Sequence, residues 1–121
     1  MYTILVVDDS PFIVDVFVTM LERGGYRTVA AYGGDECLEI LKTVTPDLIL
    51  LDIMMEPMDG WEFLETIRGE YGMTDLPVLL FTASPSVEER LATMQDKRLG
   101  VLQKPVSIAD LKEGIEKFLK Q

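Results

Sequence analysis

The sequence predicts a single α/β domain, a doubly wound (βα)5 fold in which five parallel strands form one sheet with helices on both faces. Five short apolar runs alternate with five stretches of helical periodicity. Parallel strands need right-handed helical crossovers, which cover both faces of the sheet. A chain of 121 residues is long enough for one core and too short for two. We therefore expect residues 1–121 to form one domain.

The expected strands are five apolar runs, at residues 3–7, 28–32, 48–51, 78–81 and 100–103. The run from Leu48 to Leu51 is unbroken, which suits a strand buried on both faces. The run at 28–32 is weaker because it contains alanines. Pro46 and Pro77 precede two of the runs and cannot continue a helix into them.

Boundary signals place the helices between these strands. Ser10 followed by Pro11 is typical of a helix start, and Gly24 with Gly25 is typical of a helix end. Further helices are expected after Gly34, at residues 61–68, from the loop after Thr82 through about residue 98, and after Ser107.

Helical spacing also predicts which side chains face the core. In the first helix the stripe consists of Phe12, Ile13, Val16, Phe17, Met20 and Leu21. In the last helix it consists of Ile108, Leu111, Ile115, Phe118 and Leu119. Val14 and Val18 lie outside the first stripe, so they either pack against a neighbouring helix or form exposed contacts for a partner.

Composition excludes several classes of function. A net charge of −10 argues against nucleic acid as a direct ligand, because little positive charge is available to neutralise phosphates. The single Cys37 and the absence of histidine rule out a disulfide framework and a Cys/His metal site. No apolar run approaches the roughly 18 residues of a membrane span, and no leader precedes Thr3. We expect a cytoplasmic protein without membrane insertion.

Polar residues gather at the predicted carboxyl ends of the strands. Asp8 and Asp9 follow the first strand, Asp52 the third, Thr82 the fourth and Lys104 the fifth. Each has an ordinary explanation by itself, such as a helix cap or a common strand residue. Because the carboxyl ends of parallel strands share one edge, all five are expected in the crevice where such sheets bind ligands.

This group of side chains predicts a metal-assisted phosphoryl site. Carboxylates about 4 Å apart repel by roughly 4 kcal/mol at an effective dielectric near 20, so the cluster favours a bound cation. Hard oxygen ligands select Mg²⁺, with Mn²⁺ as the alternative, over zinc. A metal with open positions, a lysine charge and a threonine donor can hold a phosphoryl group. The nucleophile inside such a site is a carboxylate, which forms an aspartyl-phosphate.

The chain resembles the receiver domain of two-component response regulators, the CheY-like family with a flavodoxin-like fold. The resemblance covers Ile4 to Leu119. It is carried by four marks and their spacing, namely Asp8-Asp9, Asp52 followed by Met58-Asp59-Gly60, Thr82-Ala83 and Lys104-Pro105.

The resemblance implies a role for each site residue. Asp52 accepts phosphate from the phosphohistidine of a sensor histidine kinase or phosphotransfer protein. Asp9 binds Mg²⁺ directly, Asp8 mainly through water, and the backbone carbonyl of Met54 adds a ligand. Thr82 and Lys104 contact the phosphoryl group, and the peptide between Lys104 and Pro105 is expected to be cis. Such a domain is a signalling module and not an enzyme, although it assists its own phosphorylation and dephosphorylation.

Three features depart from the family pattern. Val101 stands where the family usually has an aromatic residue coupled to Thr82, so we expect activation to be read out differently. Glu56 replaces a proline, and Pro57 follows one position later. Met54 and Ser84 occupy positions that tune phosphate hydrolysis, and the bulky Met54 predicts a long-lived phosphorylated state.

The resemblance also implies two interaction surfaces. The output surface runs from Val87 to Lys120, for a downstream protein effector or a phosphorylation-dependent homodimer. The first helix, with Phe12 and Val14, is the expected docking face for the kinase. We expect no output domain after Gln121, and we therefore expect the activity to be passed on by protein contact.

Three alternatives compete with this interpretation. A flavodoxin-type flavin-binding module needs a hydroxyl- and glycine-rich loop after the first strand, where Asp8-Asp9 would repel a phosphate. An aspartate-nucleophile phosphatase needs two aspartates one residue apart, and here they are adjacent. A degenerate receiver that serves as a phosphorylation-independent scaffold is favoured by Val101 and Glu56, and opposed by the intact five-residue set.

Overall fold

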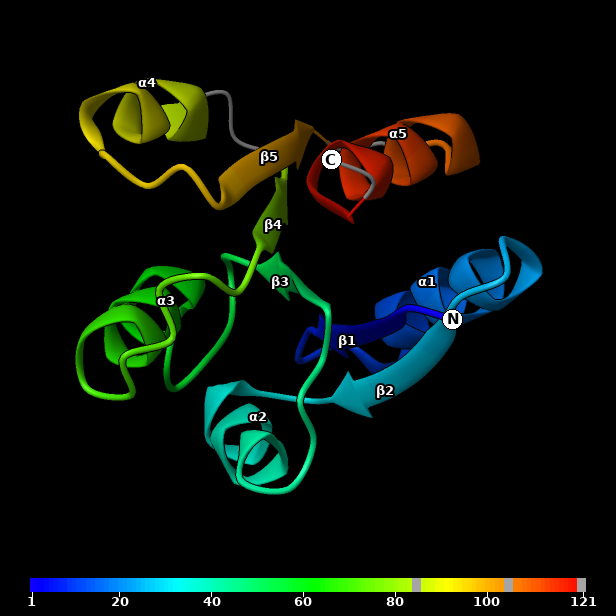
Figure 1. Ribbon diagram of the computed structural model, residues 1–121, viewed down its shortest axis with the longest axis horizontal. Helices are drawn as coiled ribbons and strands as arrows, with labels where there is room; N and C mark the ends of the chain where they lie inside the picture. Colours follow the sequence, from blue (N-terminus) through cyan, green and yellow to red (C-terminus); the bar gives the residue numbers. More distant parts are fainter. Residues whose placement is uncertain (84–85, 104–105, 120–121) are drawn as a thin grey trace.

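The computed structural model describes residues 1–83, 86–103 and 106–119, in which strands and helices alternate along the chain (Figure 1). The strands are β1 (Thr3–Val7), β2 (Arg27–Ala31), β3 (Leu48–Asp52), β4 (Val78–Thr82) and β5 (Leu99–Gln103). The helices are α1 (Pro11–Arg23), α2 (Gly34–Leu41), α3 (Gly60–Gly69), α4 (Ser86–Thr93) and α5 (Ile108–Leu119). The predicted (βα)5 architecture is confirmed.

The sheet positions the site through its strand order. The order is β2-β1-β3-β4-β5, and every pairing is parallel. The chain runs outward in one direction from β1 and in the other from β3, so the helices that follow these two strands lie on opposite faces. A crevice opens at the carboxyl ends of such a pair of strands.

The core consists of two layers, one on each face of the sheet. Figure 1 shows α1 and α5 covering one face and α2, α3 and α4 covering the other. Successive strand residues alternate between the layers: Ile49 and Leu51 pack toward α2 and α3, whereas Leu48 and Leu50 pack toward α1 and α5. Burial on both faces explains why β3 is an unbroken apolar run.

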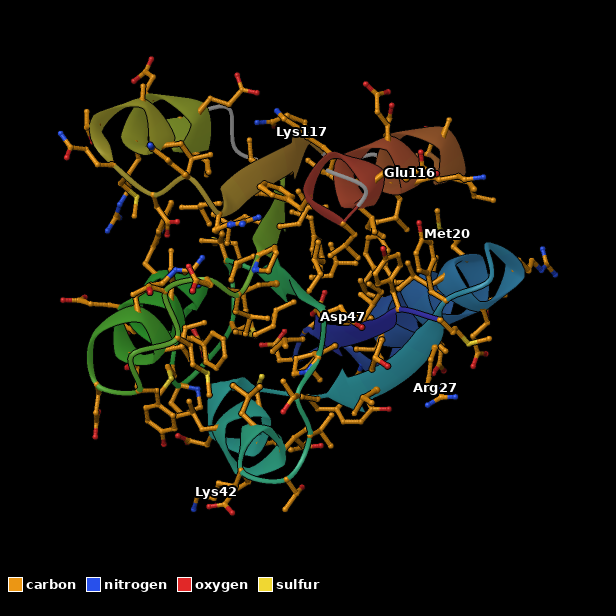
Figure 2. All side chains as sticks on the ribbon, in the orientation of Figure 1. Met20, Arg27, Lys42, Asp47, Glu116 and Lys117 are labelled. Carbon is orange, nitrogen blue, oxygen red and sulfur yellow. The ribbon has the colours of Figure 1, made fainter. Side chains whose placement is uncertain are left out.

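Side chains fill the spaces between the sheet and the helices, whereas charged residues such as Arg27 and Lys42 point outward (Figure 2). Cys37 is buried in the α2 layer, and burial raises the pKa of its thiol far above the usual range, with a smaller contribution from the Glu36 charge. Cys37 is therefore a small buried hydrophobic residue. Within the described part of the chain, every helix is too short or too polar to cross a lipid bilayer.

The core-facing stripe of α1 was predicted correctly at Phe17 and Leu21 and wrongly at its other end. Val14 is buried together with Phe17 and Leu21, whereas Phe12 is 73% exposed and Val16 is also exposed. Positions 14, 17 and 21 lie on the helix face that packs against the sheet, one step around from the predicted centre. Val14 is therefore a core residue and not part of a docking face.

In α3, Phe63, Leu64 and Ile67 are buried, and Trp61 is half-buried. The predicted stripe of the last helix needs one correction. In α5, Ile108 is exposed at the first residue of the helix.

Helix α4 ends at Thr93, before the predicted limit near residue 98. The side chain of Asp96 accepts a hydrogen bond from the backbone N–H of Arg98 at 2.9 Å. This local bond gives the backbone an alternative to the helix, and the chain turns into β5.

Candidate functional site

The loop after β1 holds two carboxylates in different environments. Asp8 is buried, its backbone N–H donates to the carbonyl of Ala31 at 3.2 Å, and its Oδ1 accepts from the N–H of Ser10 at 2.9 Å. Asp9 is exposed. Ser10 caps α1 as predicted, since its hydroxyl accepts from the N–H of Ile13 at 3.4 Å. The start of α1 therefore fixes the loop that carries both aspartates.

Asp52 is the last residue of β3 and is 4% exposed. Its Oδ1 accepts a hydrogen bond from the backbone N–H of Met54 at 3.1 Å, which orients the carboxylate. The next turn is closed on the carbonyl of Ile53, which accepts from Met55 at 3.1 Å and from Gly60 at 2.9 Å. The side chain of Met54 points into solvent and is 75% exposed.

Gly60 seats the start of α3 directly on the end of β3. A Cβ atom at this position would lie 2.7 Å from the carbonyl oxygen of Asp52 and 2.7 Å from the Cα of Ile53. Both are backbone atoms, so they cannot move aside as the tip of a side chain could. Asp59 caps the helix, because its Oδ1 accepts from the N–H of Glu62 at 2.9 Å.

We expect Gly60→Ala to lower the free energy of unfolding by about 2–3 kcal/mol, in the range of overpacking substitutions. The matched control is Gly69→Ala at the other end of α3, where an added Cβ meets no atom within 4 Å. That variant should be neutral or up to about 1 kcal/mol more stable, because alanine favours helices. Urea unfolding measures both; equal stability of the two variants would contradict the close packing at Gly60.

The structure brings together the three predicted carboxylates. One oxygen each from Asp8, Asp9 and Asp52 lies within 4.8 Å of the others. At that separation each pair of charges repels by roughly 3–4 kcal/mol at an effective dielectric near 20. Two of the three groups are buried, so solvent screens this repulsion poorly. A set of three hard carboxylate oxygens fits Mg²⁺, which takes few protein ligands and keeps several waters.

Thr82 is the last residue of β4 and is 2% exposed. In the sheet register Asp52 pairs with Phe81, so Thr82 stands one residue beyond Asp52 on the neighbouring strand. Its partner on β5 is Gln103, the residue before Lys104. The predicted hydroxyl is therefore at the same edge of the sheet as the three carboxylates.

Some predicted features lie outside the described residues. These are the ammonium group of Lys104, the expected cis peptide between Lys104 and Pro105, and Ser84. In the described part of the chain the cis peptide is between Glu56 and Pro57, in the loop where the family pattern differs.

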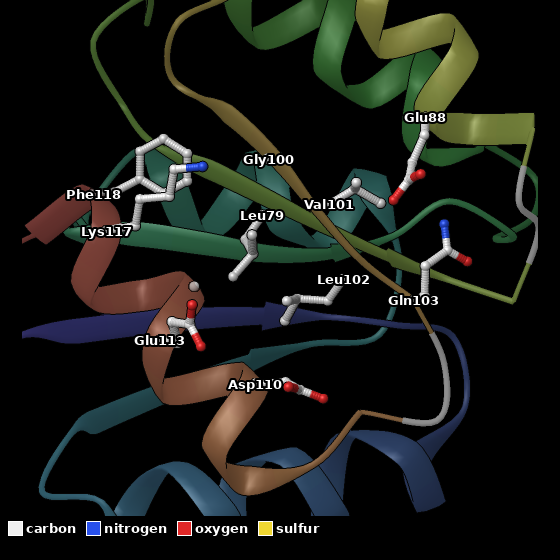
Figure 3. Close-up of a pocket in the computed structure, with 11 residues that line it drawn as sticks. Leu79, Glu88, Gly100, Val101, Leu102, Gln103, Asp110, Glu113, Lys117 and Phe118 are labelled. Carbon is white, nitrogen blue, oxygen red and sulfur yellow. The ribbon is translucent and has the colours of Figure 1, made fainter.

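A groove of about 350 Å³ lies over β5, between α4 and α5 (Figure 3). Its lining includes Val101, Leu79 and Leu102, together with a glycine of β5 and a glycine of α5. Carboxylates of Glu88, Asp110 and Glu113 border it, and in the view of Figure 3 Lys117 lies at the end opposite Glu88. The groove lies within the surface that the sequence predicts for output.

The sequence predicts Arg68 only as the last residue of a helix, whereas in the structure its side chain connects three segments of the chain. Its guanidinium donates to the carbonyls of Met73 (2.6 Å), Leu76 (2.6 Å) and Arg98 (3.1 Å), and to the carboxylate of Asp96 (2.9 Å). We call these four contacts the Arg68 clamp. The partners lie up to 30 positions away in sequence, so helical periodicity carries no signal for them.

The chain belongs to the family of response regulator receiver domains, whose pattern matches residues 4–116. It is a receiver domain of two-component signal transduction, the class that the sheet topology and the acidic edge define. Among curated relatives, the chain is 34% identical to the response regulator MprA of Mycobacterium tuberculosis. That match covers 98% of this chain and 50% of the relative, so the chain spans about half the length of such relatives.

Solved structures agree with this assignment. The N-terminal domain of a response regulator receiver protein from Methanoculleus marisnigri is 55% identical, with a TM-score of 0.80 over 100% of this chain and 98% of that one. The chemotaxis protein CheY4 of Vibrio cholerae is 28% identical, with a TM-score of 0.87 over 98% of both chains.

Proposed function

We propose that residues 1–121 act as one phosphoacceptor domain, in which Asp52 takes a phosphoryl group from a histidine kinase or phosphotransfer protein. The observation that carries this proposal is the cluster of Asp8, Asp9 and Asp52 at the carboxyl edge of the sheet. Three carboxylates held this close together repel one another, and a bound divalent cation would offset that repulsion and attract a phosphoryl group.

In the proposed transfer, a carboxylate oxygen of Asp52 forms a bond to phosphorus while the phosphorus–nitrogen bond of the donor phosphohistidine breaks. The electron pair of that bond leaves with the imidazole. The N–H of Met54 holds the Asp52 carboxylate in place for this attack. Bound Mg²⁺ would neutralise the charges of the carboxylates and the incoming phosphoryl oxygens.

The remaining site residues would bind and orient. Asp8 and Asp9 would hold the cation, with the carbonyl of Met54 as a further proposed ligand. Thr82, one residue beyond Asp52 across the β3–β4 pairing, would donate its hydroxyl to a phosphoryl oxygen. Lys104, which follows β5 in the sequence, would balance the added negative charge of about −1.5 to −2.

Met54 closes the turn on Asp52 through its backbone N–H, and we propose that its exposed side chain hinders the water that would hydrolyse the phosphorylated state. Met54→Asn should therefore shorten the lifetime of that state severalfold, which corresponds to about 1 kcal/mol in the barrier. The decay of phosphorylated protein by intact mass, after removal of the donor, measures this. Hydrolysis as slow in Met54→Asn as in the wild type would contradict the proposed hindrance.

Two surfaces are proposed for partners. The kinase or phosphotransfer protein would dock near the start of α1, where Phe12 and Val16 are exposed. Val16 takes the place of Val14 in this proposed docking face, because Val14 is buried. The effector, or a second copy of the chain, would bind the groove between α4 and α5. A change at Asp52 would bias the conformation of that face.

Intact mass after incubation with acetyl phosphate, with Mg²⁺ or with a chelator, tests the proposed function. We expect the gain of one phosphoryl group that requires Mg²⁺, and proteolytic mapping should place it in the peptide that contains Asp52. Absence of any gain, although Mg²⁺ binding is detected, would favour a phosphorylation-independent scaffold.

A further inference from the structure

Helix α4 is held to the rest of the molecule by few contacts. Of its eight residues, all within the described part of the chain, Val87 alone is buried, and Leu91 is half-buried. A helix with so little buried apolar surface is easily displaced. Whatever else holds α4 therefore determines how far it can move.

Helix α3 supplies two contacts that hold this segment. Near its start, the ring of Trp61 lies 4.0 Å from the guanidinium carbon of Arg90 in α4. Seven residues later on the same helix face, Arg68 contacts Asp96 in the segment after α4. Between these two contacts is a groove of about 680 Å³.

The two contacts differ in strength. The Arg68 clamp has four partners, and the side chains of Arg68 and Asp96 are only 14% and 17% exposed. The contact of Trp61 with Arg90 is a single cation–π interaction to an exposed arginine. The segment 86–98 is thus firmly fixed at its end and weakly held in its middle.

The contact between Trp61 and Arg90 is connected to Asp52 through the backbone of Gly60. Gly60, the residue before Trp61, donates its N–H to the carbonyl of Ile53 and leaves no room for a Cβ beside Asp52 and Ile53. A backbone shift at Asp52 and Ile53 must therefore displace Gly60, and Trp61 moves with it. On the β5 side of α4, Val101 offers only a small side chain.

We propose that Trp61 and Arg90 are positioning residues that couple the state of Asp52 to the position of α4, with the Arg68 clamp as the fixed end of the moving segment. This inference rests on the proposed phosphorylation of Asp52 and adds its regulatory route. Phosphorylation shifts the loop at 53–59, moves Trp61 under Arg90 and changes how tightly α4 is held. The bistable element is α4, and the aspartyl-phosphate biases it.

Hydrogen exchange of the α4 amides, measured with and without acetyl phosphate and Mg²⁺, tests the coupling. The variants are Arg90→Gln, Trp61→Leu and the double variant, with Arg23→Gln in the last turn of α1 as the matched control. Intact mass is recorded on each sample, so the extent of phosphorylation is known. Fluorescence of Trp61, the only tryptophan in the chain, gives a second readout in the wild type and in Arg90→Gln.

Without phosphorylation, Arg90→Gln should exchange about two- to fivefold faster in α4, the equivalent of about 0.5–1 kcal/mol for an exposed cation–π contact. Its phosphorylation-dependent changes in α4 exchange and in Trp61 emission should fall by at least half. The double variant should show the same α4 exchange rates as the single variants, because each single substitution already removes the contact between Trp61 and Arg90. Arg23→Gln should behave as the wild type does.

Two results would overturn the inference, and they are distinguishable. If Arg90→Gln gains the phosphoryl group and keeps the full wild-type change in α4 exchange, the coupling runs elsewhere and the proposed function stands. If the wild type itself gains no phosphoryl group, the proposed function fails and this inference fails with it.

Discussion

Asp52→Asn is expected to abolish the phosphoryl gain from acetyl phosphate while the fold is retained. An amide oxygen is a far weaker nucleophile than a carboxylate, and the amide keeps the shape of the side chain. The oxygen of this amide can still accept the hydrogen bond from the N–H of Met54, which the Asp52 carboxylate accepts at 3.1 Å. Removing one of three clustered charges also lowers the repulsion at the site, so stability should not fall.

The matched control for this prediction is Asp59→Asn. Asp59 lies in the same loop and caps α3 through the N–H of Glu62, and asparagine is an equally good cap. This variant should gain the phosphoryl group as fully as the wild type, measured by intact mass under identical conditions. A full gain in Asp52→Asn would mean that another carboxylate is the acceptor and would refute the proposed role of Asp52.

Arg68→Met is expected to lower the free energy of unfolding by about 3–4 kcal/mol. The substitution removes the donor for three backbone carbonyls and leaves the mostly buried carboxylate of Asp96 without its cation. The clamp joins α3, the segment before β4 and the segment before β5, so its loss loosens three parts of the molecule together. Urea unfolding, followed by circular dichroism, measures the change.

A matched control separates the clamp from charge loss alone. Lys42→Met breaks the ion pair of Lys42 with Glu39, whose side chains are 58% and 72% exposed. Solvent screens an exposed pair of this kind almost completely, so the control should be nearly neutral. Arg68→Lys should recover only part of the stability, because an ammonium cannot reach four partners in the planar arrangement of a guanidinium. A loss below about 1 kcal/mol in Arg68→Met would refute a structural role for the clamp.

Most of the fold could be predicted from local patterns. Apolar runs of four or five residues predicted each strand within one residue of its observed bounds, and helical spacing predicted the helices between them. The end of α4 was predicted about five residues too late, because the side chain of Asp96 stabilises a turn within a segment that has helical spacing. The face of α1 was misjudged for a related reason: Phe12, Val14 and Val16 are all apolar, and only packing against the sheet determines which is buried.

The candidate site was also predictable, because it depends on one topological rule. Once the strands are parallel, the residues at the carboxyl ends of β1, β3 and β4 must share an edge, and Asp8, Asp9, Asp52 and Thr82 do. The chemistry then followed from residue types, since three carboxylates without histidine or paired cysteine indicate a hard cation.

The sequence by itself determined the strands, their direction and the acidic edge, since these depend on periodicity over a few residues and on the geometry of crossovers. Only the tertiary structure decided the seat of Gly60 on β3, the Arg68 clamp and the contact of Trp61 with Arg90. Each of these joins residues that are distant in the chain and whose types are common on any helix surface. These contacts form only when the helices pack on the sheet, because that packing, and not the local sequence pattern, brings the atoms within contact distance.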